Sequence, residues 1–399
     1  MKYLKRRLFE IKMTIIEIND RRSGKEFLNV ARVIYKDDKN WVCPMDRDIE
    51  SVFNPDHNSY FNHGTAMRWV LKDNTGKLAG RIAAFIDYNT MNNNDQPTGC
   101  CGFFECIDDQ ESANILFNTA KDWLKAKGME AMDGPVNFGE TDKYWGLLVD
   151  GFTQPSYHVA YNPRYYQKLF EAYGFKTYYK QEGFHYDVRK PVLERFRKIS
   201  ERVNNNSEYS FEHFRFKELD KYVDDFTQVF NVAWADFKKD FEPLSPDYVR
   251  KFITDAKPIL EEKFIWLAYH KDKPIAIYLM IPDVNQIFKK FNGKLNLWNK
   301  LRLLYMVKTK KMSRAKGLLM GVIPRFQGKG IESGFILQLE KVFRQMPNYT
   351  ELEFSFVADF NPPMRNLWLA VGAEPAKHYI TYRYLFDRTR EFKRYPIPE

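Results

Sequence analysis

The most informative pattern of apolar and polar residues lies at 317–343. An apolar run, 318–323, ends at Pro324 and is followed by a polar, glycine-rich stretch at 325–330. Apolar residues then recur at intervals typical of one helical face, at Ile331, Phe335, Ile336, Leu339 and Val342. The pattern predicts a buried strand, a glycine-rich turn and an amphipathic helix in direct succession.

The same order of segments occurs in the first half of the chain. An apolar strand is predicted over 102–107 and an amphipathic helix over 112–127, joined by a turn that is acidic and lacks glycine. Two apolar strands with a hairpin turn precede each unit, at 66–72 and 78–87 in the first half and at 264–270 and 274–281 in the second. The repeated order predicts two domains of the same architecture.

The predicted elements divide the 399 residues into four parts. An N-terminal extension, 1–12, precedes a first domain at 13–190. A linking helix and an asparagine-rich hinge follow at 191–209, and a second domain occupies 210–399. A chain of this length can build two domains, each with its own hydrophobic core.

The turn at 325–330 has the properties of an anion-binding site. The first N–H groups of a helix have no partner within the helix, and the helix dipole adds positive potential there. Gly328 and Gly330 have no Cβ and would let the backbone approach a phosphate or pyrophosphate closely. Arg325 and Lys329 add positive charge beside them. The acidic turn of the first half would instead repel a pyrophosphate.

Three anion-binding motifs compete for this turn. The Walker loop is excluded, because Ile323 and Gly330 stand where it needs a glycine and a Ser or Thr. The dinucleotide fingerprint fits only in part, because Ser333 occupies the place of its third glycine. The pattern Arg/Gln-x-x-Gly-x-Gly/Ala fits without adjustment, with Arg325, Gly328 and Gly330 in place.

With this loop, its preceding strand and its following helix, the chain resembles the GNAT superfamily of acyl-CoA-dependent N-acyltransferases. A later Asn361-Pro362 segment adds to the resemblance, which covers 13–386. The resemblance implies an α/β fold of the α+β type with two GNAT-like domains. In each, helices flank a central twisted sheet that is mixed and mostly antiparallel. It also implies that only the second domain binds CoA, since only this domain has the loop.

The resemblance further implies where the cofactor lies. In the family, the strand before the loop splays away from the strand after its helix, and the pantetheine arm lies between them, here between 318–323 and 351–357. Backbone groups of Val322 and Ile323 would pair with the arm, and a backbone N–H would polarise the acyl carbonyl. Asn361 would bind the pantetheine region or cap a helix. The expected cofactor-binding residues are Val322, Ile323, Arg325, Phe326, Gln327, Gly328, Lys329, Gly330, Ile331 and Asn361.

Direct acyl transfer to an amine needs a base for the amine and an acid for the thiolate of CoA. Glu353 and Asp359, on or just beyond the strand after the helix, are the candidate bases. Many family members place a tyrosine acid where this chain has Trp368, whose indole cannot donate a proton as a phenol can. Tyr379 and Tyr382 on the last predicted strand are the substitute acids. Each of these four candidate side chains has a structural role as its alternative.

The net charge of +10 indicates an electropositive surface that suits an anionic cofactor. It also keeps open an acidic partner such as RNA, an acyl carrier protein or a membrane surface. The densest basic run, 308–316, is interpreted as a solvated loop or an electrostatic funnel for the cofactor rather than a nucleic-acid site. An amphipathic stretch at 295–306 would cover a long acyl chain, form a dimer contact or pack on the core.

Composition and cysteine spacing indicate a cytoplasmic protein. Hydrophobic residues make up 44% and charged residues 29% of the chain, and no apolar run has the length of a membrane span. The four cysteines, Cys43, Cys100, Cys101 and Cys106, match no zinc motif, so reduced thiols and no metal site are expected.

The sequence therefore predicts an acyl-CoA-dependent N-acyltransferase. The simplest reaction is transfer of acetyl from acetyl-CoA, or of another acyl group, to a primary amine of a small molecule or peptide. One alternative is a noncatalytic GNAT-fold module that binds an acidic partner, which Trp368 favours. Another is an acyltransferase that uses a tRNA or carrier-protein donor, against which the intact loop argues. A nicotinamide-dependent oxidoreductase would need the glycine that Ser333 replaces.

Overall fold

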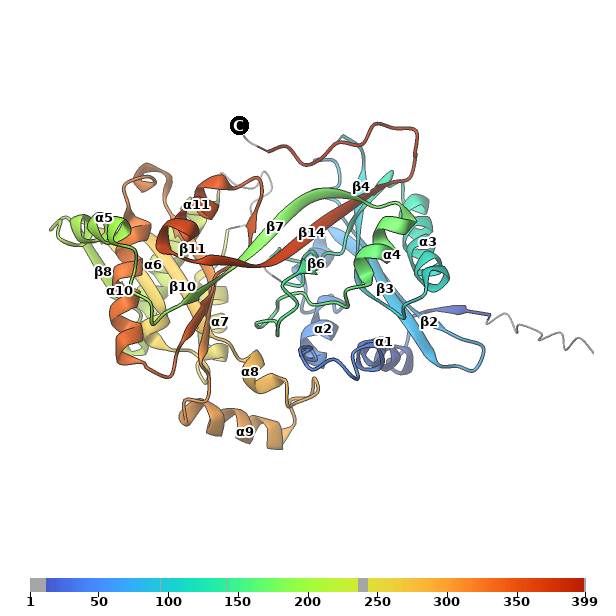
Figure 1. Cartoon of the computed structure of the whole chain (residues 1–399), viewed down its shortest axis with the longest axis horizontal. Helices are drawn as coiled ribbons and strands as arrows, with labels where there is room; N and C mark the ends of the chain where they lie inside the picture. Colours follow the sequence, from blue (N-terminus) through green and yellow to red (C-terminus); the bar gives the residue numbers. More distant parts are fainter. Residues whose placement is uncertain (1–11, 94, 142, 236–242, 398–399) are drawn as a thin grey trace, which may run out of the picture. The chain divides into compact units, whose positions relative to one another are not determined.

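The structure is a computed structural model that describes residues 12–93, 95–141, 143–235 and 243–397 (Figure 1). The chain forms two compact units. Unit 1 comprises Met1–Val149, Ala160–Tyr178 and Ile380–Arg394, and unit 2 comprises Asp150–Val159, Tyr179–Tyr379 and Tyr395–Glu399. These units differ from the contiguous ranges 13–190 and 210–399, because two long strands, β7 (Lys176–Asp187) and β14 (Glu374–Leu385), contribute residues to both. All but residue 12 of the predicted extension lies outside the described residues.

The strands of unit 1 form a mixed, mostly antiparallel sheet. Its order is β1 (Thr14–Glu17), β2 (Gly64–Lys72), β3 (Leu78–Asp87), β4 (Thr98–Cys106), β5 (Ala131–Gly134) and β14, with β6 (Leu147–Asp150) also paired to β14. The predicted hairpin is confirmed as β2 and β3. The pair β4–β5 is parallel, whereas the pairs β1–β2, β2–β3, β3–β4 and β5–β14 are antiparallel.

Successive side chains of a strand point to opposite faces of the sheet, and β2 has apolar side chains on both. Helices cover both faces of the unit 1 sheet. Trp69 and Leu71 pack in the core under α3 (Gln110–Ala126) and α4 (Tyr166–Tyr173). Val70 points to the other face and packs against α1 (Arg21–Ile34) and α2 (Asp46–Val52). Helix α1 begins with a capping box, in which Asp20 is the N-cap and bonds reciprocally with Ser23.

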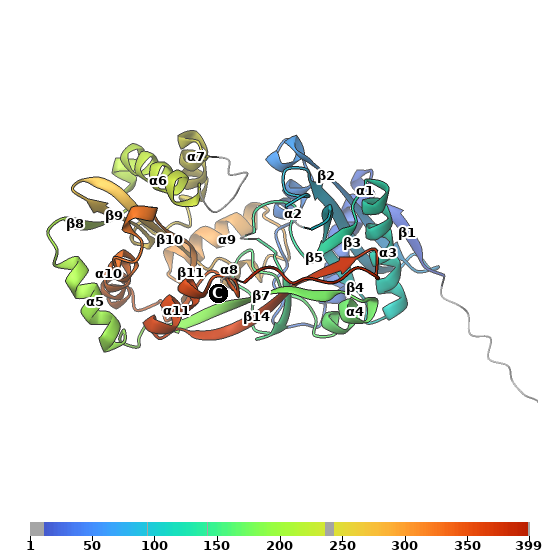
Figure 2. The ribbon, with the colours of Figure 1, turned by 90° about the horizontal axis from the view of Figure 1, so that it is seen from above.

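Unit 2 repeats this plan. Its strand order is β14, β7, β12 (Glu351–Glu353), β11 (Arg314–Val322), β10 (Lys273–Pro282), β9 (Ile265–His270) and β8 (Tyr209–His213), with β13 (Val357–Ala358) paired to β7. Helices α6 (Leu219–Trp234) and α7 (Pro246–Ala256) lie on one side of β9, β10 and β11 (Figure 2). Helices α5 (Glu194–Asn204) and α10 (Ile331–Gln345) lie on the other side. The remaining helices are α8 (Asn285–Phe288), α9 (Leu297–Lys308) and α11 (Pro362–Val371).

One strand is shorter than its apolar pattern indicates. The strand predicted over 351–357 is broken into β12 and β13, and between them the N–H of Phe354 donates to the carbonyl of Phe184 on β7. Helix α3 agrees with its predicted range to within two residues, and α10 begins at Ile331, the first apolar position of the predicted helix. None of the helices in the described part of the chain combines the length and apolar character that a membrane span needs.

Candidate functional site

The predicted anion-binding loop joins β11 to α10. After Val322 the chain makes a single 3-10 turn, Pro324–Phe326, and then passes through Gly328 and Gly330 into the helix. Both glycines have positive φ, +70° and +82°, a region that L-residues with a Cβ enter at a cost. Gly330 is the N-cap of α10. The backbone path of the turn therefore favours glycine at both positions.

The loop presents backbone donors that have no partner. Within the described residues, no acceptor is found for the N–H groups of Gly328, Lys329, Gly330 and Ile331. Arg325 and Lys329 are exposed, and their charged groups lie 5.0 and 4.9 Å from the centre of the Phe326 ring. Four free donors at a helix start beside two cations suit an oxyanion such as a pyrophosphate.

The loop is held in place by buried neighbours. Phe326 is 6% exposed, and its ring contacts His270 and Tyr209. The side chain of Gln327 reaches back and donates from Nε2 to the carbonyl of Val322 at 3.0 Å. Gln327 thus fixes the loop relative to the end of β11, and Phe326 fixes it relative to β8 and β9.

Strands β11 and β12 separate after a short parallel contact. Only three residue pairs join them, from Arg314 with Glu351 to Lys316 with Glu353. Strand β11 then continues to Val322 in pairing with β10, while no described strand pairs with its other edge. A register shift leaves Leu318 without a partner in β10, as in a β-bulge. The predicted separation of the two strands is therefore present, and it begins at Gly317.

The free edge of β11 offers backbone groups from alternate residues. The N–H of Ile323 donates to the carbonyl of Ile275 on β10, and its carbonyl accepts from Phe326. Ile323 is therefore not available to pair with a pantetheine arm, contrary to the prediction. By alternation, Met320 and Val322 present their N–H groups to the edge away from β10. Val322 lies on this free edge and stays a predicted binding residue. Met320 was missed because the bulge and register are not visible in the sequence.

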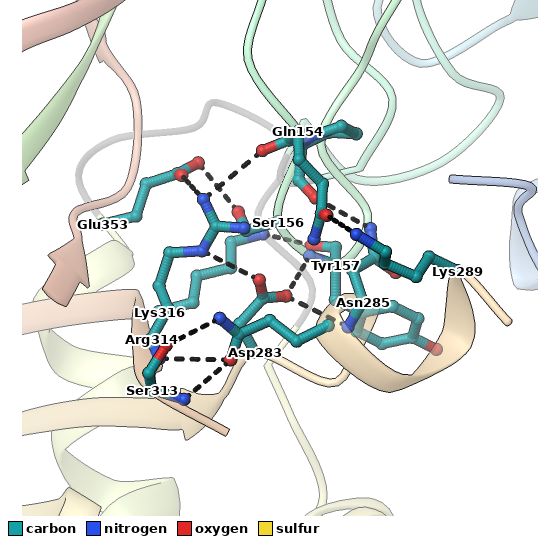
Figure 3. A network of polar contacts seen from close by, with 12 residues as sticks. Gln154, Ser156, Tyr157, Asp283, Asn285, Lys289, Ser313, Arg314, Lys316 and Glu353 are labelled. Carbon is teal, nitrogen blue, oxygen red and sulfur yellow. Dashed lines mark hydrogen bonds and ion pairs between the residues drawn. The ribbon is translucent and has the colours of Figure 1, made fainter. Parts of the chain in front are cut away.

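Glu353, a predicted base, is part of a buried ionic cluster. Its carboxylate accepts a hydrogen bond from Ser156 Oγ at 2.8 Å and lies 3.5 Å from Arg314 (Figure 3). It also accepts from Lys377 Nζ at 2.8 Å. Burial alone would raise the pKa of Glu353, but Lys377 and Arg314 lower it below the usual 4.5. A carboxylate stabilised in this way is a weak base. Its position at the last β11–β12 pair fits a positioning role.

The same cluster corrects the interpretation of the basic run 308–316. Arg314 and Lys316 belong to β11 and are buried, so this part of the run is not a solvated loop. Arg314 Nε donates to Asp283 Oδ2 at 2.9 Å, and Lys316 Nζ donates to the carbonyl of Tyr157 at 2.6 Å (Figure 3). Burial raises the pKa of Asp283 against the opposing charge of Arg314. The partners of these cations are remote in sequence, which is why the pattern did not reveal them.

The other predicted catalytic side chains have different surroundings in the structure. Asp359 accepts from the N–H of Lys180 at 3.1 Å. Tyr379 is buried against Phe356, and burial together with the charge of Glu353 raises its pKa well above the usual value. Tyr382 belongs to unit 1, where its hydroxyl donates to Glu171 at 2.9 Å. The structure thus leaves Asp359 and Tyr379 as candidates within unit 2.

Asn361, at the start of α11, and Trp368, within it, both have structural roles. Asn361 is the N-cap, and its Oδ1 accepts from the N–H of Met364 at 3.4 Å. Trp368 is 1% exposed and stacks on Phe354, with ring centres 4.0 Å apart. The indole therefore fills the core at the place where the family tyrosine was expected.

In unit 1, β4 has the position that β11 has in unit 2, but its free edge is occupied by side chains. Strand β4 pairs with β5 through only three residues, as β11 does with β12. At Cys106, the last residue of β4, the N–H donates to Tyr166 Oη at 2.8 Å and the carbonyl accepts from Tyr165 Oη at 2.7 Å. The following turn is acidic, and Asp109 caps α3. Tyrosine hydroxyls thus occupy the edge that remains open in unit 2, a substitution that sequence reasoning missed.

Metal-ligating side chains do not gather in the described residues. No group of three His, Cys, Asp or Glu side chains there could hold a metal ion, and all four cysteines are free. The candidate site consists of backbone donors, a free strand edge and cations.

Comparisons with known proteins bear on the fold of the chain. No family model matches the sequence. The chain is 27% identical over 383 residues to the bacterial ceramide synthase of Caulobacter vibrioides, covering 93% of this chain and 96% of that protein. It is 26% identical over 375 residues to the Escherichia coli protein YghO, covering 90% and 92%. A solved tandem GNAT protein from the clavulanic acid biosynthesis pathway matches 95% of this chain and 100% of its own, with a TM-score of 0.56 and 12% identity. That likeness concerns the fold alone.

Proposed function

From the GNAT fold that this chain has in tandem, we propose that it is an acyltransferase that binds an acyl-CoA in unit 2 and acylates a primary amine. The observation that carries the proposal is the continuity of two features. The open edge of β11 leads directly into a loop with four free backbone N–H groups. A ligand with an amide-bearing arm and a pyrophosphate at its end matches that order of features, and CoA is such a ligand.

The arm of CoA would add to the sheet as a short strand. Its amides would pair with the backbone of Met320 and Val322, and its pyrophosphate would accept from the N–H groups of 328–331. Arg325 and Lys329 would contribute charge. The closed edge at Cys106 in unit 1 supports a single site in each chain, because Tyr165 and Tyr166 already satisfy the equivalent backbone groups.

The catalytic groups are proposed on chemical grounds. Asp359 is the remaining candidate base, because Glu353 is held by buried cations that weaken it as a base. Tyr379 is the candidate proton donor to the departing thiolate, since of the two candidate phenols it is the one that lies in unit 2. Tyr382 is assigned a structural role through its bond to Glu171.

The acceptor class is suggested by a relative. A ceramide is a long-chain amino alcohol with an acyl group in amide linkage, and a protein 27% identical over most of this chain is named a bacterial ceramide synthase. Because amide formation at a primary amine is the reaction expected of this fold, we propose long-chain amino alcohols as the first acceptors to test. Small polar amines and peptides are the alternatives.

Calorimetric titration of CoA into the whole protein tests the donor site. We expect one CoA per chain in the wild type and no detectable binding in Gly328→Glu, which places a carboxylate among the free N–H groups. Gly328→Asn is the matched control, because asparagine tolerates the positive φ at this position without adding charge. Wild-type protein that is folded but does not bind CoA would contradict the proposal and favour the noncatalytic module or a macromolecular donor.

Release of CoA thiol measures the reaction itself. With an acyl-CoA that binds, we expect turnover with a long-chain amino alcohol and at least tenfold lower kcat/KM with a short amino alcohol. Turnover with the short amine alone would retain the acyltransferase and reject the long-chain acceptor. Binding without turnover on any of the three amine classes would reject catalysis.

A further inference from the structure

Helix α9 presents an uncovered apolar face. Five large side chains of this helix are at least half exposed: Leu297, Trp298, Leu301, Leu304 and Tyr305. At 3.6 residues per turn they fall within an arc of about 120° around the helix axis. Trp298 is the most exposed of them, at 79%. Scattered exposed apolar residues are ordinary, but five on one face of one helix form a patch.

The opposite face of α9 is less exposed than the arc. Asn299, Leu303, Met306 and Val307 are half-buried and lie on the side away from the exposed arc. Asn296 caps the helix by accepting from the N–H of Asn299 at 3.0 Å, and the side chain of Asn299 donates to the carbonyl of Lys294 at 2.7 Å. The apolar arc is therefore the side of the helix that faces solvent. The structure excludes packing of this arc on the core, one of the three interpretations of 295–306.

Charge around the arc indicates the kind of partner. Lys300 and Arg302 are exposed and lie about 40° beyond the two borders of the arc. The sequence from 284 to 331 contains twelve Lys and Arg residues and no Asp or Glu. Further exposed lysines, Lys294, Lys308, Lys310 and Lys311, stand at the two ends of the helix. An apolar stripe with cations along both borders matches a surface that is apolar inside and anionic at its rim.

We propose that α9 docks this protein on the surface of an anionic lipid bilayer. The helix would lie in the interface, with Leu297, Leu301 and Leu304 below the headgroups and with Trp298 and Tyr305 at headgroup level. Lys300 and Arg302 would extend outward to lipid phosphates while their methylene chains follow the apolar surface. The proposal rests on α9 and its charges, so it does not depend on acyl transfer.

Two other partners fit the surface less well. A symmetric contact between α9 helices of two copies would bring Lys300 and Arg302 of both into one interface, with no acidic residue in 284–331 to pair with them. Nucleic acid would neutralise the cations but would leave Leu297, Leu301 and Leu304 without an apolar environment. An anionic bilayer offers an apolar interior to the arc and phosphates to the basic residues at its borders.

Vesicle flotation of the full chain tests the proposal. We expect the wild type to float with vesicles of phosphatidylcholine and phosphatidylglycerol at 3:1 by about tenfold more than with phosphatidylcholine alone. Trp298→Ser/Leu301→Ser should reduce the partition coefficient at least tenfold on the anionic vesicles. Lys300→Gln/Arg302→Gln should reduce it severalfold and should lessen its dependence on salt. These side chains are exposed, so circular dichroism should show both variants folded.

The matched control lies on α7, where Tyr248 and Phe252 are 59% and 44% exposed. Tyr248→Ser/Phe252→Ser removes comparable apolar surface from a helix outside the basic region, and it should leave flotation unchanged. Failure of the wild type to float, or equal loss in the control, would overturn the proposal. So would sedimentation equilibrium that shows a dimer broken by Trp298→Ser/Leu301→Ser in a protein that does not bind vesicles.

Discussion

The ammonium of Lys377 lies 2.8 Å from the carboxylate of Glu353, and their side chains are only 4% and 7% exposed. Glu353 is at the point where β11 and β12 separate, and Lys377 is on β14. Both charges have been removed from water, so each depends on the other for its electrostatic stabilisation. The pair thus anchors the strand arrangement that opens the proposed acyl-CoA site.

Removal of one member of this pair should destabilise unit 2 strongly. Glu353→Gln retains the shape but leaves Lys377 and Arg314 without the carboxylate, and we expect a loss of about 3–5 kcal/mol in the free energy of unfolding. Urea denaturation followed by circular dichroism measures the change. The control is Glu208→Gln, which breaks an exposed pair with Lys271 and should leave the free energy of unfolding close to that of the wild type. Equal losses for the two variants would contradict the anchoring role.

The same pair predicts a pH dependence. The pKa of Glu353 is lowered in the folded protein, so the unfolded state takes up a proton first as the pH falls. Its contribution to stability is therefore fully present above about pH 4.5 and is lost as the pH drops through the lower folded pKa. The stability difference between the wild type and Glu353→Gln should shrink below pH 4.5 in urea titrations. A difference that stays constant down to pH 3 would show that the charge contributes nothing.

The sequence predicted elements whose causes are local. Apolar periodicity and turn residues located both hairpins, and the glycine spacing located a loop whose two glycines have positive φ. It did not predict the cluster around Glu353, because Ser156, Asp283 and Lys377 are remote from it in the chain. Long-range pairing determines whether a charged residue in a basic run is solvated or buried, and a single sequence contains no signal for that pairing.

The predicted site residues also divide into those fixed by local sequence and those that depend on long-range pairing. Val322 was placed correctly on the free edge of β11, whereas Ile323 was not, since its N–H donates to Ile275. The direction of a backbone group depends on strand register, which a bulge at Leu318 shifts. Asn361 was given two roles, and the structure provides the helix cap. The alternation of Met320 and Val322 becomes visible only when the partner strand is known.

The closed edge of β4 predicts both a stability effect and a stoichiometry. Tyr166 Oη accepts from Cys106 and donates to Glu105 at 2.8 Å, so Tyr166→Phe leaves buried polar groups unpaired. We expect a loss of about 1–3 kcal/mol in the stability of unit 1 by urea denaturation. CoA binding by calorimetry should remain one per chain with unchanged affinity, because unit 1 lacks the loop. A second CoA in either protein would contradict the closed edge.

Trp368 is predicted to pack in the core and to take no part in proton transfer. Its ring is buried on Phe354, and its Nε1 has no hydrogen-bond partner in the described residues, so Trp368→Phe loses packing but no polar contact. We expect a cost of about 1–2 kcal/mol for Trp368→Phe and about 3–5 kcal/mol for Trp368→Ala. Trp368→Tyr restores the phenol found in many family members. Because the packed ring is fixed by Phe354, its kcat should equal that of Trp368→Phe within twofold. A tenfold higher kcat for the tyrosine variant would make this position the place of the acid.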